Sequence, residues 1–214
     1  MRSQNKRQDT AYSRRRPVRE PYARVLIVCE GEKTEPNYLR GLQREQGLSS
    51  VNINVVSPPN SDPLSLVRFA IQALTQDPDL DCGYCVFDRD QHANFGQALD
   101  LIAKSSLGVA GKLSGITSTP CFELWLLLHF RYSTMSYIGA GGASACDRLI
   151  SDLRAHFPTY VKAHKDVYGA LADRVQDALE NAEALGRHNE STGSANPGTE
   201  MHRLVRYLTS LKKR

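Results

Sequence analysis

The chain has 214 residues, a formal net charge of +4 and a hydrophobic content of 41%. This length and composition supply enough apolar side chains for one substantial folded domain, which excludes a chain that is disordered throughout. The sequence contains no run of about 18 apolar residues and no apolar segment near its start, so we expect a cytoplasmic protein without a membrane span or a secretory signal.

Positive charge is concentrated at the start of the chain. Residues 1–24 hold eight Arg or Lys and two acidic residues, which leaves the rest of the chain mildly acidic. We therefore predict a basic, disordered arm over residues 1–23. Such an arm either holds nucleic-acid phosphates through salt-dependent contacts or is a solvated tail without a specific partner, and composition leaves both interpretations open.

Strand and helix patterns alternate after the arm. Apolar runs between polar turns predict strands, and apolar positions at helical spacing predict helices, the first with Thr34 as its N-cap. This alternation predicts an α/β fold with a parallel four-stranded sheet flanked by helices. In chain order we expect a strand at 24–29, a helix at 34–48, a strand at 51–56, a helix at 62–76, a strand at 83–88, a helix at 94–106 and a strand at 112–118.

The pattern changes in the second half of the chain. Residues 120–130 read as a nearly all-apolar helix, and 138–145 as a glycine-rich loop. Apolar stripes at helical spacing then predict helices at 166–185 and 199–214. We accordingly divide the folded chain into an α/β core, 24–133, and a C-terminal helical part, 134–214, packed on it.

Cysteines are present in an odd number, five, and most lie in apolar surroundings. This usage favours reduced, buried thiols over a disulfide framework. Cys82 and Cys85 form a single C-x-x-C without a second pair, so a structural zinc or redox role is the less favoured interpretation.

Carboxylates follow two of the predicted strands. Glu30 comes directly after the first strand, and Asp88 and Asp90 come at and after the end of the third. In open parallel sheets ligands bind outside the carboxyl ends of the strands, so these acids are expected to converge there. Their mutual repulsion calls for a positive counter-charge, and Mg²⁺, with Mn²⁺ as a substitute, prefers oxygen ligands. Solvated loop acids or helix N-caps are the plainer interpretation of each residue taken alone.

The motifs "VLIVCEGEKTEPNYL" and "VFDRD" resemble the Toprim fold of topoisomerases, primases and OLD-family nucleases. Together with "STPCFELWLLLHF" and "NPGT", in this order, they resemble the RloB family of restriction-linked and abortive-infection loci. The resemblance extends from about residue 24 to the C-terminus. It implies that Glu30 acts in acid–base or metal chemistry, and that Asp88 and Asp90 bind Mg²⁺.

Two further residues are candidates for the same site. Glu123 is flanked by apolar residues, and an unpaired buried carboxylate is costly, so it is expected to be a further metal ligand or to pair with a basic core residue. Lys162 lies where the family carries a lysine and could stabilise charge developing on a phosphate, although a surface lysine is the plainer interpretation. Glu35 is assigned to the start of its helix, where an acid complements the dipole.

The resemblance implies a metal-dependent nuclease that cleaves DNA or RNA as an anti-phage defence effector, with Glu30, Asp88, Asp90, Glu123 and Lys162 as catalytic residues. The alternative is a catalytically silent module that binds nucleic acid or a partner in a defence complex. The chain contains no G-x-x-x-x-G-K-[ST] motif, so any ATP-dependent regulation would need an ATPase subunit encoded nearby. The oligomeric state is left open.

Overall fold

The computed structural model describes residues 23–48, 53–59, 62–89 and 93–211. Residues 1–22 of the predicted arm, and Asp90, lie outside these ranges. The strands are β1 (Val25–Cys29), β2 (Ile53–Val56), β3 (Cys82–Asp88), β4 (Leu113–Thr119) and β5 (Gly198–Thr199). The helices are α1 (Thr34–Glu45), α2 (Pro63–Gln76), α3 (Phe95–Lys104), α4 (Ser106–Val109), α5 (Glu123–Leu128), α6 (Ala145–His156), the 3-10 helix η1 (Gly169–Arg174), α7 (Val175–Thr192) and α8 (Met201–Ser210).

The five strands form one mixed sheet in the order β2-β1-β3-β4-β5. The first four strands are parallel, and β5 is antiparallel to β4. The α/β class is therefore confirmed, whereas the prediction of a purely parallel four-stranded sheet is wrong. The fifth strand has two residues, too few for an alternating pattern, and a hydrogen bond between Ser118 Oγ and Thr199 Oγ1 (3.0 Å) helps to hold it on β4.

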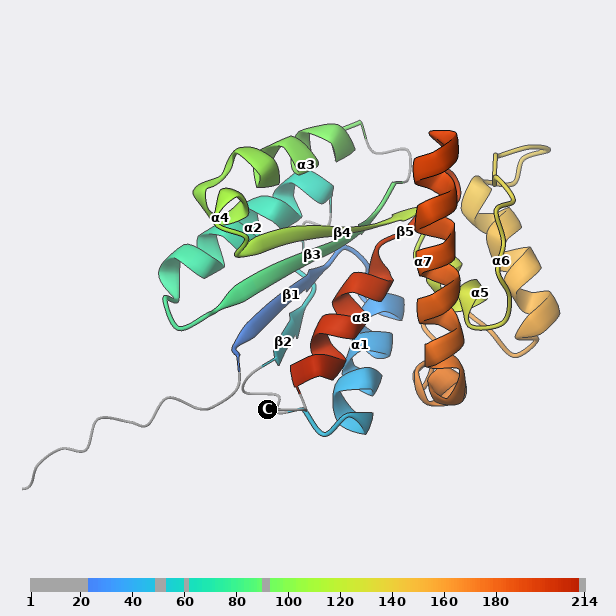
Figure 1. Ribbon diagram of the computed structural model, residues 1–214, viewed down its shortest axis with the longest axis horizontal. Coiled ribbons are helices and arrows are strands. Elements are labelled where there is room, and N and C mark those ends of the chain that lie inside the picture. The colour runs from blue at the N-terminus through green and yellow to red at the C-terminus, as the bar shows by residue number, and fades with distance from the viewer. Residues whose placement is uncertain (1–22, 49–52, 60–61, 90–92, 212–214) are drawn as a thin grey trace, which may run out of the picture.

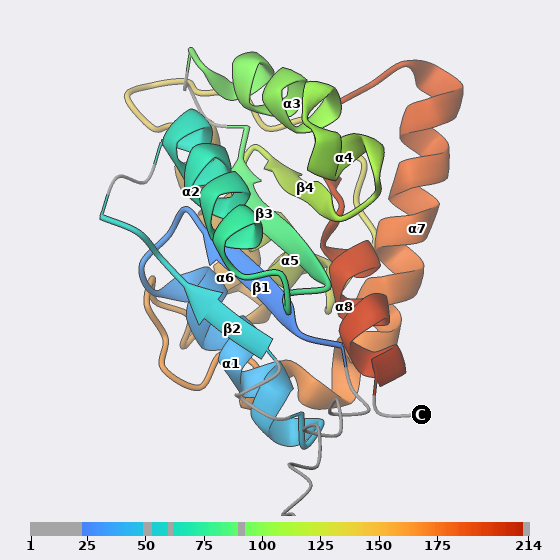
Figure 2. The same ribbon diagram turned by 90° about the vertical axis from the view of Figure 1, so that its left-hand side faces the viewer.

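Helices cover both faces of the sheet (Figures 1 and 2). Alternate residues of β1 point to opposite faces, so that Val25 and Ile27 enter one core while Leu26 and Val28 enter the other. The first core includes side chains of α1, α5, α6, α7 and α8, and the second includes side chains of α2 and α3. A strand buried on both faces explains why β1 reads as a continuous apolar run.

The register of the sheet sets which strand ends lie side by side. Cys29 of β1 is paired with Val86 of β3, and the N–H of Glu30 donates to the carbonyl oxygen of Val86 at 2.9 Å. Both strands run in the same direction, so their carboxyl ends reach one edge of the sheet. Glu30 and Asp88 are thereby placed on neighbouring strand ends.

Helix α6 was not predicted from the sequence. It begins with a capping box in which Ser144 and Asp147 bond each other's backbone N–H, and it buries Leu149, Ile150 and Leu153. Three buried apolar positions in a 12-residue helix make a narrow stripe, too weak a pattern to predict a helix next to a glycine-rich loop.

The starts of two other helices differ from the predictions. Thr34 is not the N-cap of α1: that position is Lys33, which makes no side-chain capping bond. The hydroxyl of Thr34 instead accepts a hydrogen bond from the N–H of Ala163 (3.2 Å). The helix predicted over 166–185 is divided into η1 and α7.

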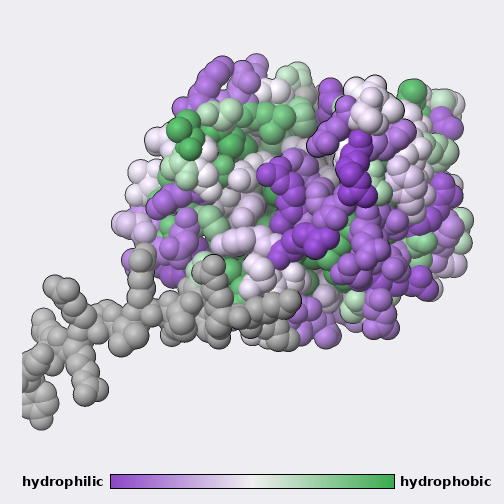
Figure 3. Space-filling model, in the orientation of Figure 1, coloured by the Kyte–Doolittle hydropathy of each residue, from purple (hydrophilic) through white to green (hydrophobic). Residues whose placement is uncertain are grey.

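Among the residues that the structure describes, no helix is long and apolar enough to cross a membrane. The surface over α7 and α8 is hydrophilic, and apolar residues gather over α3 and α4 (Figure 3). The predicted division near residue 133 stays a prediction, and one core cluster joins side chains from both sides of it.

Candidate functional site: an acidic pocket at the strand ends

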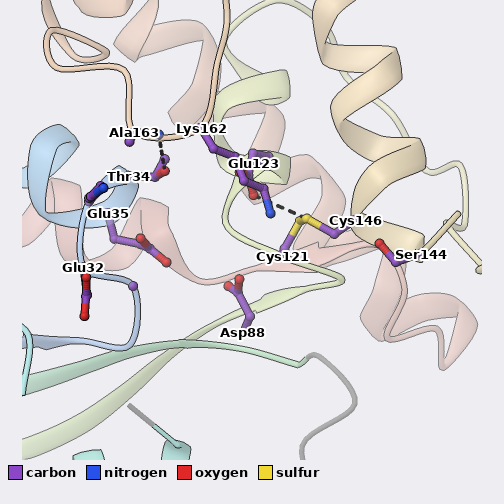
Figure 4. A pocket seen from close by; sticks show the side chains of 12 residues that line it. Glu32, Thr34, Glu35, Asp88, Cys121, Glu123, Ser144, Cys146, Lys162 and Ala163 are labelled. Atoms are coloured by element: carbon purple, nitrogen blue, oxygen red, sulfur yellow. Dashed lines mark hydrogen bonds between the residues drawn. A yellow bond between two sulfur atoms is a disulfide. The ribbon is translucent and has the colours of Figure 1, made fainter. Parts of the chain in front are cut away.

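A cavity of about 640 Å³ lies at the carboxyl end of the parallel strands. Its walls come from the turn after β1, the end of β3, the start of α5 and two segments of the C-terminal half (Figure 4). The lining residues are Gly31, Glu32, Lys33, Thr34, Glu35, Asp88, Cys121, Glu123, Ser144, Cys146, Lys162 and Ala163.

Glu30 and Asp88 are joined directly across the strand ends. The Glu30 carboxylate accepts a hydrogen bond from the backbone N–H of Asp88 through Oε2, at 2.9 Å. This contact fixes the Glu30 side chain at the shared edge of β1 and β3. The Asp88 side chain, half-buried at the end of β3, points into the cavity (Figure 4).

Glu35 also belongs to this group of acids, although the sequence predicted for it only a contact with the helix dipole. It stands in the first turn of α1, is 8% exposed, and directs its carboxylate back over Gly31 toward Asp88 (Figure 4). Burial is the main cause that raises its pKa to about 7, and the charges of Glu123 and Glu30 add to the effect. The sequence signal that could have placed Glu35 near Glu30 is their spacing, Glu30-x-x-x-x-Glu35, across a tight turn.

Glu123 enters the pocket from the first turn of α5 and is 4% exposed. Its Oε1 accepts a hydrogen bond from the hydroxyl of Tyr160 at 2.8 Å. Burial raises the pKa of Tyr160, so this hydroxyl stays protonated and available as a donor. The buried carboxylate thus has a neutral hydrogen-bond donor, which leaves its charge in the cavity unneutralised by that contact.

The electrostatics of the pocket favour a cation. Burial raises the pKa of Asp88 well above its ordinary value, and the charges of Glu35, Glu123 and Glu30 raise it further. Carboxyl oxygens gathered at one cavity are the kind of ligand that a hard divalent cation such as Mg²⁺ prefers, and such a cation would lower their mutual repulsion.

Lys162 lines the pocket and supplies positive charge there. Its side chain is exposed, and its charge acts to lower the pKa of Glu35. The neighbouring Ala163 has a left-handed backbone conformation (φ 69°) and is held on α1 by bonds to Thr34 and Asn37. Lys162 is thus carried by a segment anchored to the helix that presents Glu35.

Glu32 and His129 do not join this cluster of acids. The Glu32 carboxylate is directed to the side of the cavity, away from Asp88 (Figure 4). His129 is fully buried, contacts Tyr38 Oη (3.1 Å) and the Trp125 carbonyl oxygen (2.9 Å), and has its pKa lowered to about 4 by burial. His129 is therefore a core histidine with a partner at each ring nitrogen.

Cys121 and Cys146 form a disulfide in the wall of the pocket, with their Cα atoms 5.8 Å apart. The prediction of reduced thiols is wrong for this pair. Sequence could not reveal the pairing because the unpredicted helix α6 carries Cys146 and brings it to the start of α5. Cys29, Cys82 and Cys85 are free, as predicted.

Reduction of the disulfide is expected to lower the free energy of unfolding by about 2–4 kcal/mol, because the intact disulfide closes a loop between residues separated by 25 positions. Urea denaturation with and without dithiothreitol measures this loss. A Cys121→Ser/Cys146→Ser variant is the control and is expected to be insensitive to the reductant. Equal stability of the native protein in both conditions would contradict the expectation.

Gly31 leaves the space that the Glu35 carboxylate occupies. A Cβ at this position would lie 2.1 Å from Glu35 Oε2, so Gly31→Ala is expected to turn the flexible Glu35 side chain out of the pocket without unfolding the chain. NMR titration of the side-chain carboxyl should then show the pKa of Glu35 falling from about 7 toward 4.5. Gly96→Ala, where an added Cβ meets nothing within 4 Å, is the control, and an unchanged pKa in Gly31→Ala would refute this role.

A mixed α/β sheet with an acidic pocket at the carboxyl ends of its parallel strands defines the structural class of this protein. The chain belongs to the RloB family: the family model described as RloB-like protein matches residues 25–208. No curated protein and no solved structure matches the chain.

Proposed function

We propose that the protein is a metal-dependent nuclease of Toprim type that hydrolyses phosphodiester bonds of DNA or RNA. The observation that carries the proposal is the gathering of Glu35, Asp88 and Glu123 at one cavity, with the carboxylate of Glu30 bonded to the backbone N–H of Asp88 beside them. Four acids so close together are a cost to folding unless they serve a ligand. Membership of the RloB family supports a defence-related or restriction-linked role.

Glu30, Asp88 and Glu123, together with Glu35, would hold Mg²⁺ or Mn²⁺. Asp90, predicted as a further ligand, lies outside the described residues. A bound divalent ion supplies Lewis-acid stabilisation of a phosphodiester and lowers the pKa of a coordinated water. The chain's own residues position the acids: the N–H of Asp88 orients Glu30, and the hydroxyl of Tyr160 orients Glu123.

Lys162 is proposed to contact the substrate. Its side chain is exposed and lines a cavity otherwise rich in acids, where the ammonium can bind a phosphate oxygen that the acids would repel. Stabilising charge on the phosphate in the transition state would make it a catalytic residue. The basic segment at the start of the chain would add sequence-independent contacts with the nucleic-acid backbone.

The biological setting is proposed from the family. The protein would act as an anti-phage effector, with an ATPase subunit encoded nearby supplying nucleotide-dependent control. A catalytically silent module that binds nucleic acid or a partner is the second candidate, and the cleavage assay separates the two.

The test is to incubate the protein with labelled single-stranded DNA, duplex DNA and RNA, in Mg²⁺, Mn²⁺ or EDTA. We expect cleavage that requires the metal and that is lost in Glu30→Gln. Glu180→Gln, an exposed acid on α7, is the matched control and should cleave like the native protein. Cleavage that persists in Glu30→Gln would remove the site assignment, and binding without cleavage in every condition would favour the silent module.

A further inference from the structure

The pocket holds a second set of potential metal ligands, distinct in chemistry from the carboxylates at the strand ends. The sulfur atoms of Cys121 and Cys146 and a carboxylate oxygen of Glu123 all lie within 4.8 Å of one another. All three residues line the cavity, so small solutes can reach them. In the structure the two sulfurs are bonded to each other.

We propose that reduction of this disulfide creates a zinc-class metal site formed by Cys121, Cys146 and Glu123. Two thiolates are soft ligands that favour Zn²⁺ over Mg²⁺, and a carboxylate oxygen is a ligand that Zn²⁺ also accepts. Three protein ligands with a fourth position open to a cavity are the arrangement of zinc sites that keep a bound water.

The spacing of the ligand atoms fits tetrahedral zinc. With a Zn–S bond of about 2.3 Å and a Zn–O bond of about 2.0 Å, the sulfur and oxygen ligands lie about 3.5 Å apart. Oε2 of Glu123 lies 3.6 Å from Sγ of Cys146. One oxygen–sulfur edge of the site is therefore already formed, Sγ of Cys121 lies within 4.8 Å of the carboxylate, and the two sulfurs need to separate.

The other oxygen of Glu123 is held by a supporting hydrogen bond. The Tyr160 hydroxyl donates to Oε1 at 2.8 Å, which leaves Oε2 to face the sulfurs. Metal-ligating carboxylates are characteristically oriented by such outer hydrogen bonds, and their loss weakens metal binding. Tyr160 is thus a positioning residue for this site.

The conversion between the two states is a balanced redox step. A dithiol reductant gives two electrons and two protons to the Cys121–Cys146 disulfide, the S–S bond breaks, two thiols form, and the reductant becomes a disulfide. Zinc binding then replaces the two thiol protons, which pass to solvent. Cys121 and Cys146 therefore form a covalent cross-link when oxidised and serve as metal ligands when reduced.

The experiment titrates the full chain with Co²⁺ as a spectroscopic probe and with Zn²⁺ in competition, before and after reduction with dithiothreitol and removal of the reductant. Reduced native protein is expected to bind one Co²⁺ with a thiolate-to-metal charge-transfer band, which Zn²⁺ abolishes and excess Mg²⁺ does not. Oxidised protein should show no such band. The readout does not involve nucleic-acid cleavage, so its outcome is independent of the proposed nuclease activity.

Variants identify the ligands. Cys146→Ser should lose the band, whereas Cys82→Ser, at a free cysteine elsewhere in the sheet, should keep it. Tyr160→Phe should weaken Zn²⁺ binding about 10–100-fold, as expected for an outer-shell partner. Its matched control is Tyr137→Phe, which removes another buried tyrosine's bond to a carboxylate, that of Asp152, outside the pocket, and should leave affinity unchanged.

A charge-transfer band that persists in Cys146→Ser, or that forms equally in oxidised protein, would overturn the proposal. Circular dichroism of each variant confirms that it is folded. If Cys146→Ser fails to fold, the Tyr160→Phe and Tyr137→Phe pair decides: equal affinity in both would place the metal elsewhere.

Discussion

Asp88→Asn is expected to abolish metal-dependent cleavage while raising the thermal stability of the metal-free protein. In the proposed nuclease, an ion held by this cluster would supply several kcal/mol of transition-state stabilisation, so loss of a central ligand should lower the cleavage rate about a thousandfold or more. The same change removes a charge that burial and the carboxylates of Glu35, Glu123 and Glu30 disfavour. The melting temperature in EDTA should therefore rise.

The opposite signs of the two effects make this variant informative. A residue with a purely structural role loses activity and stability together, whereas a site residue that functions at the expense of folding loses activity and gains stability. The measurements are the initial rate of cleavage with Mg²⁺ and the melting temperature with EDTA.

Asp100→Asn is the control for Asp88→Asn. Asp100 is exposed on α3 and pairs with Lys104 at 3.0 Å, a surface contact worth under about 1 kcal/mol. We expect native cleavage and nearly native stability. Native activity in Asp88→Asn, or a lower melting temperature in EDTA, would show that Asp88 does not hold the metal in the way proposed.

The positions of Glu30 and Asp88 could be inferred from sequence because they depend on strand order alone. Two acids that follow parallel strands reach the same edge whenever the strands are neighbours, and β1 pairs directly with β3. Their roles as metal ligands stay predictions, as does that of Asp90. The mixed character of the sheet was missed because β5 has only two residues.

Features that depend on tertiary contacts could not be read from the sequence. Glu35 looks like an ordinary acid of a first helical turn, and only the fold shows its carboxylate turned back over Gly31. The partner of Glu123 is Tyr160, 37 positions away, rather than a basic residue, and no local pattern links the two. The disulfide depends on α6, which the sequence analysis did not predict.

The apolar context of Glu123 was nevertheless a valid signal. A charged residue inside a continuous apolar helix must be compensated, and sequence reasoning therefore singled it out. The structure shows the carboxylate buried but directed to a cavity, with one oxygen bonded and the other beside the disulfide. The role of Glu123 as a metal ligand stays a prediction, whereas its hydrogen bond with Tyr160 could come only from the fold.

Glu35 is expected to make the metal-free protein less stable as the pH rises. The pKa of its carboxyl is about 7 in the folded chain and 4.5 as the ordinary value. Between these values the folded state binds more protons than the unfolded state, so the free energy of unfolding falls with increasing pH. The free energy of unfolding that Glu35 contributes is fully present below pH about 4.5. Above pH 7, ionisation of Glu35 has lowered the free energy of unfolding by up to about 3 kcal/mol.

The measurement is urea denaturation in EDTA at pH 5 and pH 8, for the native protein and for Glu35→Gln. The neutral amide cannot ionise, so the variant should lose less stability than the native protein between the two values and should be the more stable of the two at pH 8. Glu45→Gln, at the exposed end of the same helix, is the control and should keep the native pH dependence.

Mg²⁺ links this pH dependence to the proposed site. A cation that binds the folded carboxylates stabilises the folded state by mass action, and it competes with protons for the same oxygens. Mg²⁺ should therefore raise the stability of the native protein more at pH 8 than at pH 5, and the effect should be smaller in Glu35→Gln. If Mg²⁺ stabilises the native protein and Glu35→Gln equally at both values, Glu35 belongs to the electrostatics of the fold and not to the metal site.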